Sequence, residues 1–443
     1  MFLKYSLRFL YTKNDISKLT SRITDFKRFF STKEKDVSSF VAVKLNNKRL
    51  LRISGCDSFI YLQSLLTNDM RQLLPLDCLQ NEMKNNRNIF EQICALDQPI
   101  IYSYICNSVG RVLCDLFVYR SRYRAEDGEY ILEVDAKIAT AIKRLLLGYN
   151  LSRNVKVELA SDLELWTLIP EESFFFKPDG NHINTNQQLS ELVEIDSDDI
   201  KLVSDPRIRK NNLLGYRFLT RLGGKRIEDI GKFCKVPDSS RVRLIEGELV
   251  NYNQLRYKLG VSEGILDHLS AHYFPFELNG DLLNGVSLNK GLFTSEEMII
   301  KIYSAKGIKK RIFPVIFSGP TSKINQLNPA PRTILSTVDD VKFGILHRRI
   351  GRFGIATLSI PMENNFVDFS IKKMPILRHN NSGLKVKPII PSWWPLDIEN
   401  PQLPIPDYPR CIFNFQEKDD QNQEQTFIPY EGIKEDLLQE LQI

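Results

Sequence analysis

The first group of residues that could do chemistry lies around Asp115. Arg111 precedes Asp115 by four positions in a segment of alternating residues, so both side chains are expected on one face of a strand. If that face lines a cavity, a carboxylate there can act as a general base or hold a ligand N–H. The same pattern also fits an ordinary ion pair with Arg111. Both interpretations remain open.

A second charged group lies at a predicted turn into a helix. Lys290 and Gly291 precede Glu296 and Glu297, so a cation and two carboxylates gather where backbone N–H groups are also free. Such a turn could hold the anionic tail of a ligand. A solvated capping cluster would give the same pattern.

Other signatures of catalysis or metal binding are missing from the sequence. It has no Walker A loop, no Rossmann glycine fingerprint and no nucleophile elbow. The seven cysteines show neither Cys-x-x-Cys nor zinc-finger spacing, so free thiols are expected and a permanent metal site is not. His268 and His272 are four apart, but the glutamate of the zinc protease motif is not between them, and no metal role is predicted.

An α+β framework must hold these residues. Residues 40–53 alternate as a strand pair would, residues 100–119 predict a hairpin, and helices are expected after Asp57 and after Asp135, the second stopping at Gly148. This order of strands and helices is typical of a ferredoxin-like sheet. A further helix is expected near residues 245–260. From Lys309 onward, short strand-like runs separated by Pro and Gly predict a small β-barrel or sandwich.

The charge of the chain is concentrated at its start. Of a net charge of +6 over 443 residues, +5 lies in residues 1–30, which hold seven basic and two acidic side chains. This segment predicts a mitochondrial transit peptide cut near Phe30 and Ser31, although a basic disordered tail has the same composition. The remaining chain is nearly neutral, so a nucleic-acid partner is not expected. No run of about 18 apolar residues is present, so membrane insertion is not expected either.

Several stretches resemble known proteins in order and in spacing. Residues 61–69 (YLQSLLTND), 110–115 (GRVLCD), 205–207 (DPR), 215–217 (GYR) and 290–291 (KG) resemble the folate-binding aminomethyltransferase-like (GcvT/YgfZ) family. Residues 252–264, 275–287, 309–314 (KKRIFP) and 391–395 (PSWWP) are similar to its mitochondrial iron–sulfur assembly branch, whose yeast members are called Caf-type transferases. The resemblance covers roughly residues 40–400.

The resemblance implies an α+β fold of the aminomethyltransferase type, with a central cavity. Its expected parts are the transit peptide (1–30), a ferredoxin-like N-terminal domain (40–170), a second α+β domain that completes the cavity (200–305), a C-terminal β-barrel (308–400) and a tail (401–443).

The resemblance also implies a function in the mitochondrial matrix. The protein would assist the maturation of 4Fe-4S proteins, namely aconitase-like and radical-SAM enzymes, together with A-type scaffold proteins. A folate-dependent aminomethyltransferase and a non-catalytic scaffold are the alternatives. Tetrahydrofolate is the implied cofactor, and Asp115 and Lys290 are expected beside one cavity. The residues expected at the folate site or central cavity are Asn68, Arg111, Asp115, Tyr252, Arg256, Lys290, Gly291 and Glu297.

One departure from the family concerns its signature cysteine. Family members usually read Lys-Gly-Cys-Tyr-x-Gly-Gln-Glu, whereas this chain has Leu292 at the Cys position. A leucine can be neither a nucleophile nor a cluster ligand, so any thiolates are expected to come from a partner. Glu297, a retained carboxylate, is expected to fix the loop through a hydrogen bond.

Overall fold

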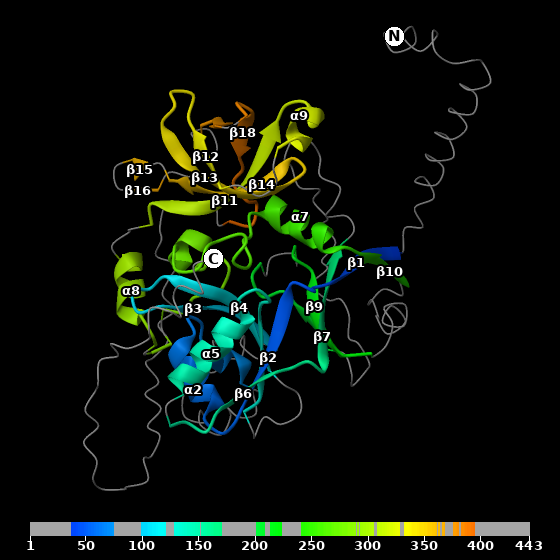
Figure 1. The fold of residues 1–443 in the computed structure, drawn as a ribbon, viewed down its shortest axis with the longest axis vertical. Helices are drawn as coiled ribbons and strands as arrows, with labels where there is room; N and C mark the ends of the chain where they lie inside the picture. Colours follow the sequence, from blue (N-terminus) through cyan, green and yellow to red (C-terminus); the bar gives the residue numbers. More distant parts are fainter. Residues whose placement is uncertain are drawn as a thin grey trace, which may run out of the picture.

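The structure is a computed structural model with two five-stranded sheets and a β-barrel (Figure 1). It describes residues 37–74, 99–120, 128–150, 152–170, 201–208, 213–223, 241–288, 290–291, 293–304, 308–327, 332–360, 362–363, 366–367, 375–380 and 382–394. The predicted transit peptide, the C-terminal tail and Leu292 lie outside the described residues.

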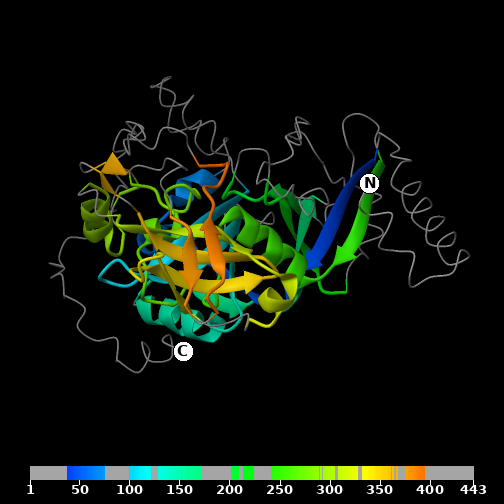
Figure 2. The same ribbon diagram turned by 90° about the horizontal axis from the view of Figure 1, so that it is seen from above.

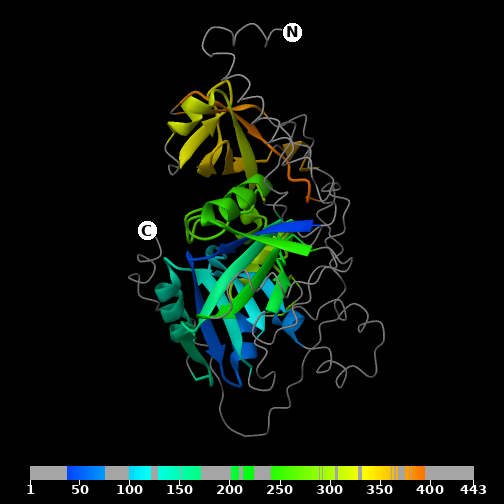
Figure 3. The same ribbon diagram turned by 90° about the vertical axis from the view of Figure 1, so that its right-hand side faces the viewer.

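The first sheet is antiparallel and carries two helices on one face. These helices, α2 (Ser58–Leu65) and α5 (Ala139–Tyr149), pack with that face in an apolar cluster that includes Leu62, Ile142 and Leu146. Figure 3 shows α5 on the outer side of the sheet. The strand order is β3 (Ile100–Cys106), β4 (Val112–Arg120), β5 (Tyr130–Asp135), β2 (Lys48–Ser54) and β6 (Lys156–Leu159).

The second sheet joins strands from distant parts of the chain. Its first strand in sequence runs parallel to the last, with Val37 opposite Arg241, and the other pairs are antiparallel. Two strands from the predicted N-terminal domain therefore complete a sheet built mostly from residues after 200. The order is β10 (Arg241–Gly247), β1 (Val37–Lys44), β7 (Leu163–Pro170), β9 (Tyr216–Arg221) and β8 (Lys201–Ser204).

The C-terminal strands form a closed barrel, seen from above in Figure 2. Its interior is apolar and includes the fully buried Phe313, Phe317 and Ile355. A short helix, α9 (Thr321–Asn325), follows the first strand, and β15 (Met362–Glu363) pairs with β16 (Phe366–Val367) beside the barrel. The barrel order is β11 (Lys310–Ser318), β14 (Phe353–Ser359), β13 (Lys342–Ile350), β12 (Thr333–Ser336), β17 (Leu377–His379) and β18 (Lys385–Pro388).

Helix α7 (Leu249–Leu259) connects the sheets to the barrel (Figure 1). It ends at Gly260, whose φ of 72° favours glycine, and an added Cβ there would lie 2.4 Å from Pro314 Cδ. Trp393 Nε1 donates to the Leu259 carbonyl at 2.9 Å, and Trp394 packs on Phe313 with ring centroids 5.1 Å apart. The Trp-Trp motif therefore fastens the barrel to the end of this helix.

The predicted fold class and barrel are confirmed, and some element boundaries are corrected. The helix expected near residues 245–260 begins at Leu249, because residues 245–247 belong to β10. Gly148 lies inside α5 and does not end it. The polar, Asn-rich residues 72–98 predict an insertion in a loop, and residues 366–371 predict a strand. Residues 75–98 and 368–371 of these two segments lie outside the described residues.

Strict alternation along the second hairpin strand predicts two faces, and the structure follows them only in the later part of the strand. The predicted faces are Val112, Cys114, Leu116 and Val118 on one side and Arg111, Leu113, Asp115, Phe117 and Tyr119 on the other. Leu116 and Val118 belong to the apolar cluster between the first sheet and its helices. Phe117 and Tyr119 belong to the cluster on the opposite face of this sheet, as alternation requires. The register shifts where Cys106 pairs with Val112 and Ile105 with Cys114, so Leu113 and Cys114 both join the helix-side cluster. This bulge reverses the predicted faces at the start of the strand.

Candidate functional site

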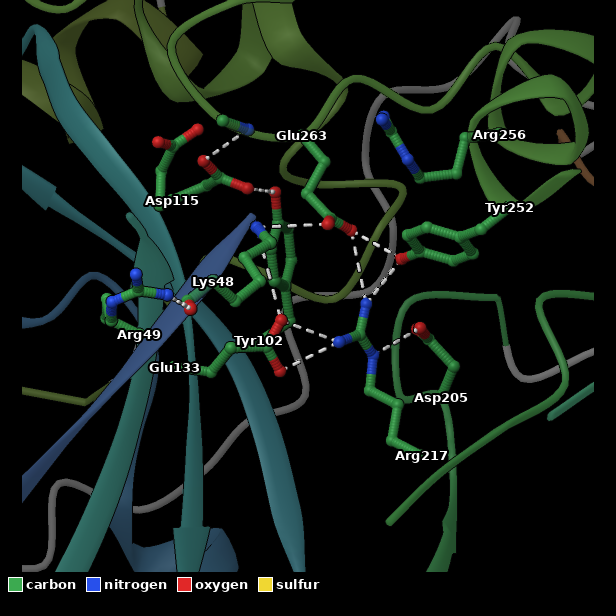
Figure 4. A network of polar contacts seen from close by, with 12 residues as sticks. Lys48, Arg49, Tyr102, Asp115, Glu133, Asp205, Arg217, Tyr252, Arg256 and Glu263 are labelled. Atoms are coloured by element: carbon green, nitrogen blue, oxygen red, sulfur yellow. Dashed lines mark hydrogen bonds and ion pairs between the residues drawn. The ribbon is translucent and has the colours of Figure 1, made fainter. Parts of the chain in front are cut away.

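The inner face of the first sheet carries charges at the place where an apolar core would be expected. Lys48 of β2, Asp115 of β4 and Glu133 of β5 point from this sheet toward the second one (Figure 4). All three side chains are at most 5% exposed. Because a buried charge is costly unless it is paired, the opposite side must supply partners.

Arg217 of β9 is the centre of these ion pairs. Its Nη1 donates to both carboxylate oxygens of Glu133 at 2.7 Å, and its Nε donates to Asp205 Oδ2 at 2.9 Å (Figure 4). Its Nη2 donates to Glu263 Oε2 at 3.1 Å, and the guanidinium carbon lies 3.8 Å from the centroid of the Phe117 ring. Each of the three nitrogens of this fully buried guanidinium therefore has a hydrogen-bond partner.

Arg207 repeats this arrangement beside Arg217. It donates to Glu263 Oε2 at 2.7 Å and to Asp205 Oδ2 at 2.8 Å, and Tyr252 donates its hydroxyl to Glu263 Oε2 at 2.6 Å. Burial opposes ionisation of Asp205 and Glu263, but the neighbouring cations outweigh it and lower the pKa of both carboxyls. Both are therefore ionised at neutral pH.

Lys48 closes the network from the first sheet. Its Nζ lies 3.0 Å from Glu263 Oε1 and 4.0 Å from Glu133 Oε1. Burial disfavours the ammonium, but these two carboxylates and Asp115 raise the pKa of Lys48 above its ordinary value. The two sheets are thus held together by charges that neutralise one another.

Both carboxylate oxygens of Asp115, the candidate general base, accept hydrogen bonds from groups of this chain. Its Oδ1 accepts a hydrogen bond from Gly264 N at 2.9 Å, and its Oδ2 accepts one from the Tyr102 hydroxyl at 3.3 Å. His268 Nε2 lies 3.5 Å from Oδ1, but burial lowers the pKa of this histidine, so it is neutral at pH 7. The carboxylate is 1% exposed. It therefore fixes the turn at residue 264.

Arg111 does not form the ion pair that was one interpretation of Asp115. Arg111 precedes β4, donates to the His272 carbonyl and stacks on Phe274, with its guanidinium carbon 4.6 Å from the ring centroid. The bulge at the start of β4 removes the simple alternation on which that interpretation depended.

Two further predicted residues, Asn68 and Arg256, are positioning residues. Asn68 Nδ2 donates to the carbonyls of Tyr102 and Asn284 at 2.7 Å each, which joins the segment after α2 to β3 of the first sheet and to the turn at Asn284. Arg256 Nη1 donates to Asp267 Oδ2 at 2.6 Å, which fastens the segment after α7 back onto that helix. Both side chains are buried.

Residues 290–295, which carry the family signature and are called the signature loop below, are bonded to α2 and not to the central ion pairs. Lys290 Nζ donates to the carbonyls of Gln63 and Leu66, the second at 2.5 Å, and Thr294 N donates to Ser64 O at 3.0 Å. Burial lowers the pKa of Lys290 to about 7. Lys290 also lies 4.6 Å from the centroid of the Phe293 ring.

The remaining residues of this motif lie at the surface. Gly291 is exposed with φ 89°, and Glu297 is exposed in the first turn of α8 (Glu296–Ser304). In the described part of the loop, Lys290 and Thr294 make the bonds that fix it. Lys290 and Asp115 contact no common group among the described residues.

Thiols and histidines form no metal centre in the part of the chain that the structure describes. No group of three His, Cys, Asp or Glu residues there could hold an ion. Cys56 is exposed, and burial raises the pKa of the buried Cys106 and Cys114. His268 and His272 lie in turns rather than on one helix. In the same ranges, no helix is long and apolar enough to cross a membrane.

The packing of this centre does not fit a bound tetrahydrofolate. The expected anchor, Asp115, already accepts hydrogen bonds from Gly264 and Tyr102, and Tyr252 is fully buried between Glu263 and the two central arginines. A pterin would have to displace these partners and leave charges unpaired. No step of a mechanism is therefore assigned to the cofactor.

Most of the network was not predicted from the sequence. A signal was present: Glu133 and Arg217 each lie between apolar residues of a strand, and Lys48 begins a strand, at positions that alternation places on the inward side. Such positions indicate buried ion pairs when cations and carboxylates occur in comparable number. The pairing itself depends on how the two sheets meet.

Comparisons with known proteins agree with this architecture. A family model described as CAF17, C-terminal beta-barrel domain, matches residues 309–396. The human mitochondrial iron–sulfur cluster assembly factor IBA57 is 27% identical over 366 residues, covering 81% of this chain and 86% of its own. The mouse protein of the same name is 25% identical, covering 81% and 87%. The chain resembles mitochondrial iron–sulfur cluster assembly factors along most of its length.

The solved structures support the fold. The glycine cleavage system aminomethyltransferase T from Bartonella henselae superposes with a TM-score of 0.51 at 14% identity, covering 81% of this chain and 87% of its own. The predicted aminomethyltransferase-like fold and the predicted family resemblance are thus confirmed. The relatives are named as mitochondrial proteins, which confirms the predicted mitochondrial location.

Proposed function

We propose that this protein assists the maturation of iron–sulfur proteins in mitochondria. The observation that carries the proposal is the similarity to the IBA57 assembly factors over four fifths of the chain. The matrix is the compartment we propose. There, the protein would serve 4Fe-4S proteins, including aconitase-like and radical-SAM enzymes.

The cluster would be cargo rather than a resident cofactor of this chain. Leu292 stands where the family has a cysteine, and a leucine side chain cannot ligate iron. The loop beside it is anchored through Lys290 to α2, so it offers a fixed surface. We therefore propose that an A-type scaffold protein supplies the thiolates and that this chain supplies the framework against which the cluster is passed on.

An aminomethyltransferase activity is not favoured. The curated relatives are named as assembly factors, and the fold alone connects this chain with aminomethyltransferase T. Binding of tetrahydrofolate stays a prediction, and the engagement of Asp115 by Gly264 and Tyr102 works against it. Calorimetric titration of the purified protein with tetrahydrofolate, with the Asp115→Asn variant as control, measures it directly.

Deletion of the gene tests the proposed function. Aconitase activity and protein lipoylation, which depends on a radical-SAM enzyme, should fall together, while malate dehydrogenase, which has no cluster, should keep its activity. Reintroducing the full chain should restore both losses. Normal aconitase activity and lipoylation in deleted cells would overturn the proposal.

A further inference from the structure

We propose that a pocket between α8, η6 (Pro275–Leu278) and the start of β11 binds an acidic segment of a partner protein that presents a bulky apolar side chain. The pocket lies apart from the central ion pairs. Figure 1 shows α8 at the edge of the molecule, beneath β11. The proposal does not depend on the proposed function.

The floor of the pocket is apolar. Phe274 and Phe276 on one side face Met298 and Ile302 of α8 on the other, around a cavity of about 490 Å³. Met298 and Ile302 are four residues apart and therefore share one face of the helix. Phe276 is fully buried and its ring packs against Tyr303, with centroids 5.3 Å apart, so this wall is supported from behind. The volume suits a large side chain or a short peptide segment.

The rim of the pocket is cationic. Lys301 and Lys309 are exposed at its edge, and Arg111 lies over the ring of Phe274. Glu277 is the one carboxylate among the lining residues. It accepts a hydrogen bond from Phe274 N at 2.9 Å and lies 3.4 Å from Lys310 Nζ, so it is already neutralised.

Charge complementarity favours an acidic segment with an apolar side chain as the ligand of this pocket. An apolar ligand alone would leave the two exposed ammonium groups without partners, whereas a segment with carboxylates on either side of a Leu or Phe would satisfy both rim and floor. Met298, at 37% exposed, adds adaptable apolar surface beside the opening. Because α8 follows the signature loop directly, an occupant that contacts Met298 would lie within one helical turn of that loop along the chain.

Fluorescence anisotropy with a labelled peptide, Asp-Glu-Asp-Leu-Phe-Glu-Asp-Glu, tests the proposal on the full chain. The probe should bind, and added salt should weaken it. Replacing its Leu and Phe by Ser, or its acids by Lys, should abolish binding. Lys301→Glu with Lys309→Glu should weaken binding roughly tenfold, which corresponds to about 1.4 kcal/mol.

Matched variants separate the pocket from general effects. Lys323→Glu on α9 combined with Lys342→Glu on β13 reverses the same number of charges at exposed positions and should leave binding unchanged. Met298→Asp should weaken binding, whereas Val341→Asp, at a position 61% exposed, should not. Loss of binding equal in rim and control variants would overturn the site. If a peptide of residues 431–443 binds more tightly than the probe, the pocket binds the C-terminal segment of this chain. That result would overturn the proposal of a partner protein.

Discussion

The region between the two sheets and the interior of the barrel are both buried, yet they are held by different forces. Between the sheets, Arg207 and Arg217 meet Glu133, Asp205 and Glu263 in ion pairs of 2.7–3.1 Å. Inside the barrel, aromatic and branched apolar side chains fill the space. Apolar burial stabilises without strict geometry, whereas buried ions stabilise only if every partner is in place.

This difference shows that the central ion pairs require one particular arrangement of their partners, whereas the barrel interior requires only apolar side chains that fill its volume. Each central arginine bridges at least two carboxylates, and these carboxylates come from different elements. A small displacement of one sheet would leave charges unpaired, so the arrangement selects a single relative position of the two sheets. The barrel can repack after substitution, but the centre cannot.

The largest expected effect is the loss of one central cation. Arg217→Ala would leave Glu133 without its main partner and would remove one of the two arginines that pair with Asp205, so the free energy of unfolding should fall by about 5 kcal/mol. Urea denaturation followed by circular dichroism measures this change. Arg378→Ala, at an exposed position of β17, is the matched control and should change it by less than about 0.5 kcal/mol. Similar losses in both variants would show that the centre is not ion-paired.

A cavity in the barrel should cost less. Phe313→Ala removes a fully buried ring that packs against Trp394, and a loss of about 3 kcal/mol is expected. Phe313→Leu should recover much of it, because the interior tolerates a similar apolar volume. If Arg217→Lys, which keeps the central charge, were tolerated as well as Phe313→Leu, the contrast between the two regions would be lost.

Mild acid should affect the two regions in different pH ranges. Burial lowers the pKa of His347 in the barrel to about 3, so the folded state binds fewer protons than the unfolded state below pH 6.5. Stability should therefore fall by about 2 kcal/mol for this residue between pH 6.5 and 5. Asp205 and Glu263 have lowered pKa values and lose their contribution only as the pH falls below about 4.5.

The His347→Gln variant isolates the barrel part of this pH dependence. Unfolding curves at pH 7 and at pH 5 should differ less for the variant than for the parent, by about 2 kcal/mol. His268 in the centre also has a pKa lowered by burial, so some dependence should remain. An unchanged difference in the variant would show that His347 is protonated in the folded barrel.

The signature loop should show a smaller effect. Lys290→Met removes the two hydrogen bonds to the end of α2, and a loss of about 1 to 2 kcal/mol in the free energy of unfolding is expected. Lys301→Met, at an exposed position of α8, makes the same chemical change without such bonds and serves as control. Thermal unfolding of the three proteins side by side measures the difference.

The smallest effect is expected at Glu297. Its side chain is exposed in the first turn of α8, so Glu297→Ala should change the free energy of unfolding by less than about 0.5 kcal/mol, apart from its favourable interaction with the helix N-terminus. Respiratory growth of cells that carry only this variant should equal that of the parent. A growth defect with unchanged stability would instead support the role first expected from its retention in the motif.

Local elements were predictable from the sequence because local forces decide them. The stripe of Ile142, Leu145 and Leu146 predicted α5, and strand-like runs between prolines and glycines predicted the barrel. The pairing of β1 with β10 and the partners of Arg217 were not predictable, because both arise from contacts between distant segments. The structure places Asn68, Asp115, Tyr252 and Arg256 as buried supports, and their role at a folate site stays a prediction.

The position of β1 has a consequence for the order in which the chain can fold. β1 lies between β7 and β10, and Val37 pairs with Arg241 about 200 residues later. A chain that emerges with its N-terminus first cannot complete this sheet until residue 247 is available. Until then β1 presents an unpaired edge, which is an aggregation hazard for the nascent protein. Removing β1 by truncation would expose β7 and β10 permanently and should turn a slow folding step into aggregation.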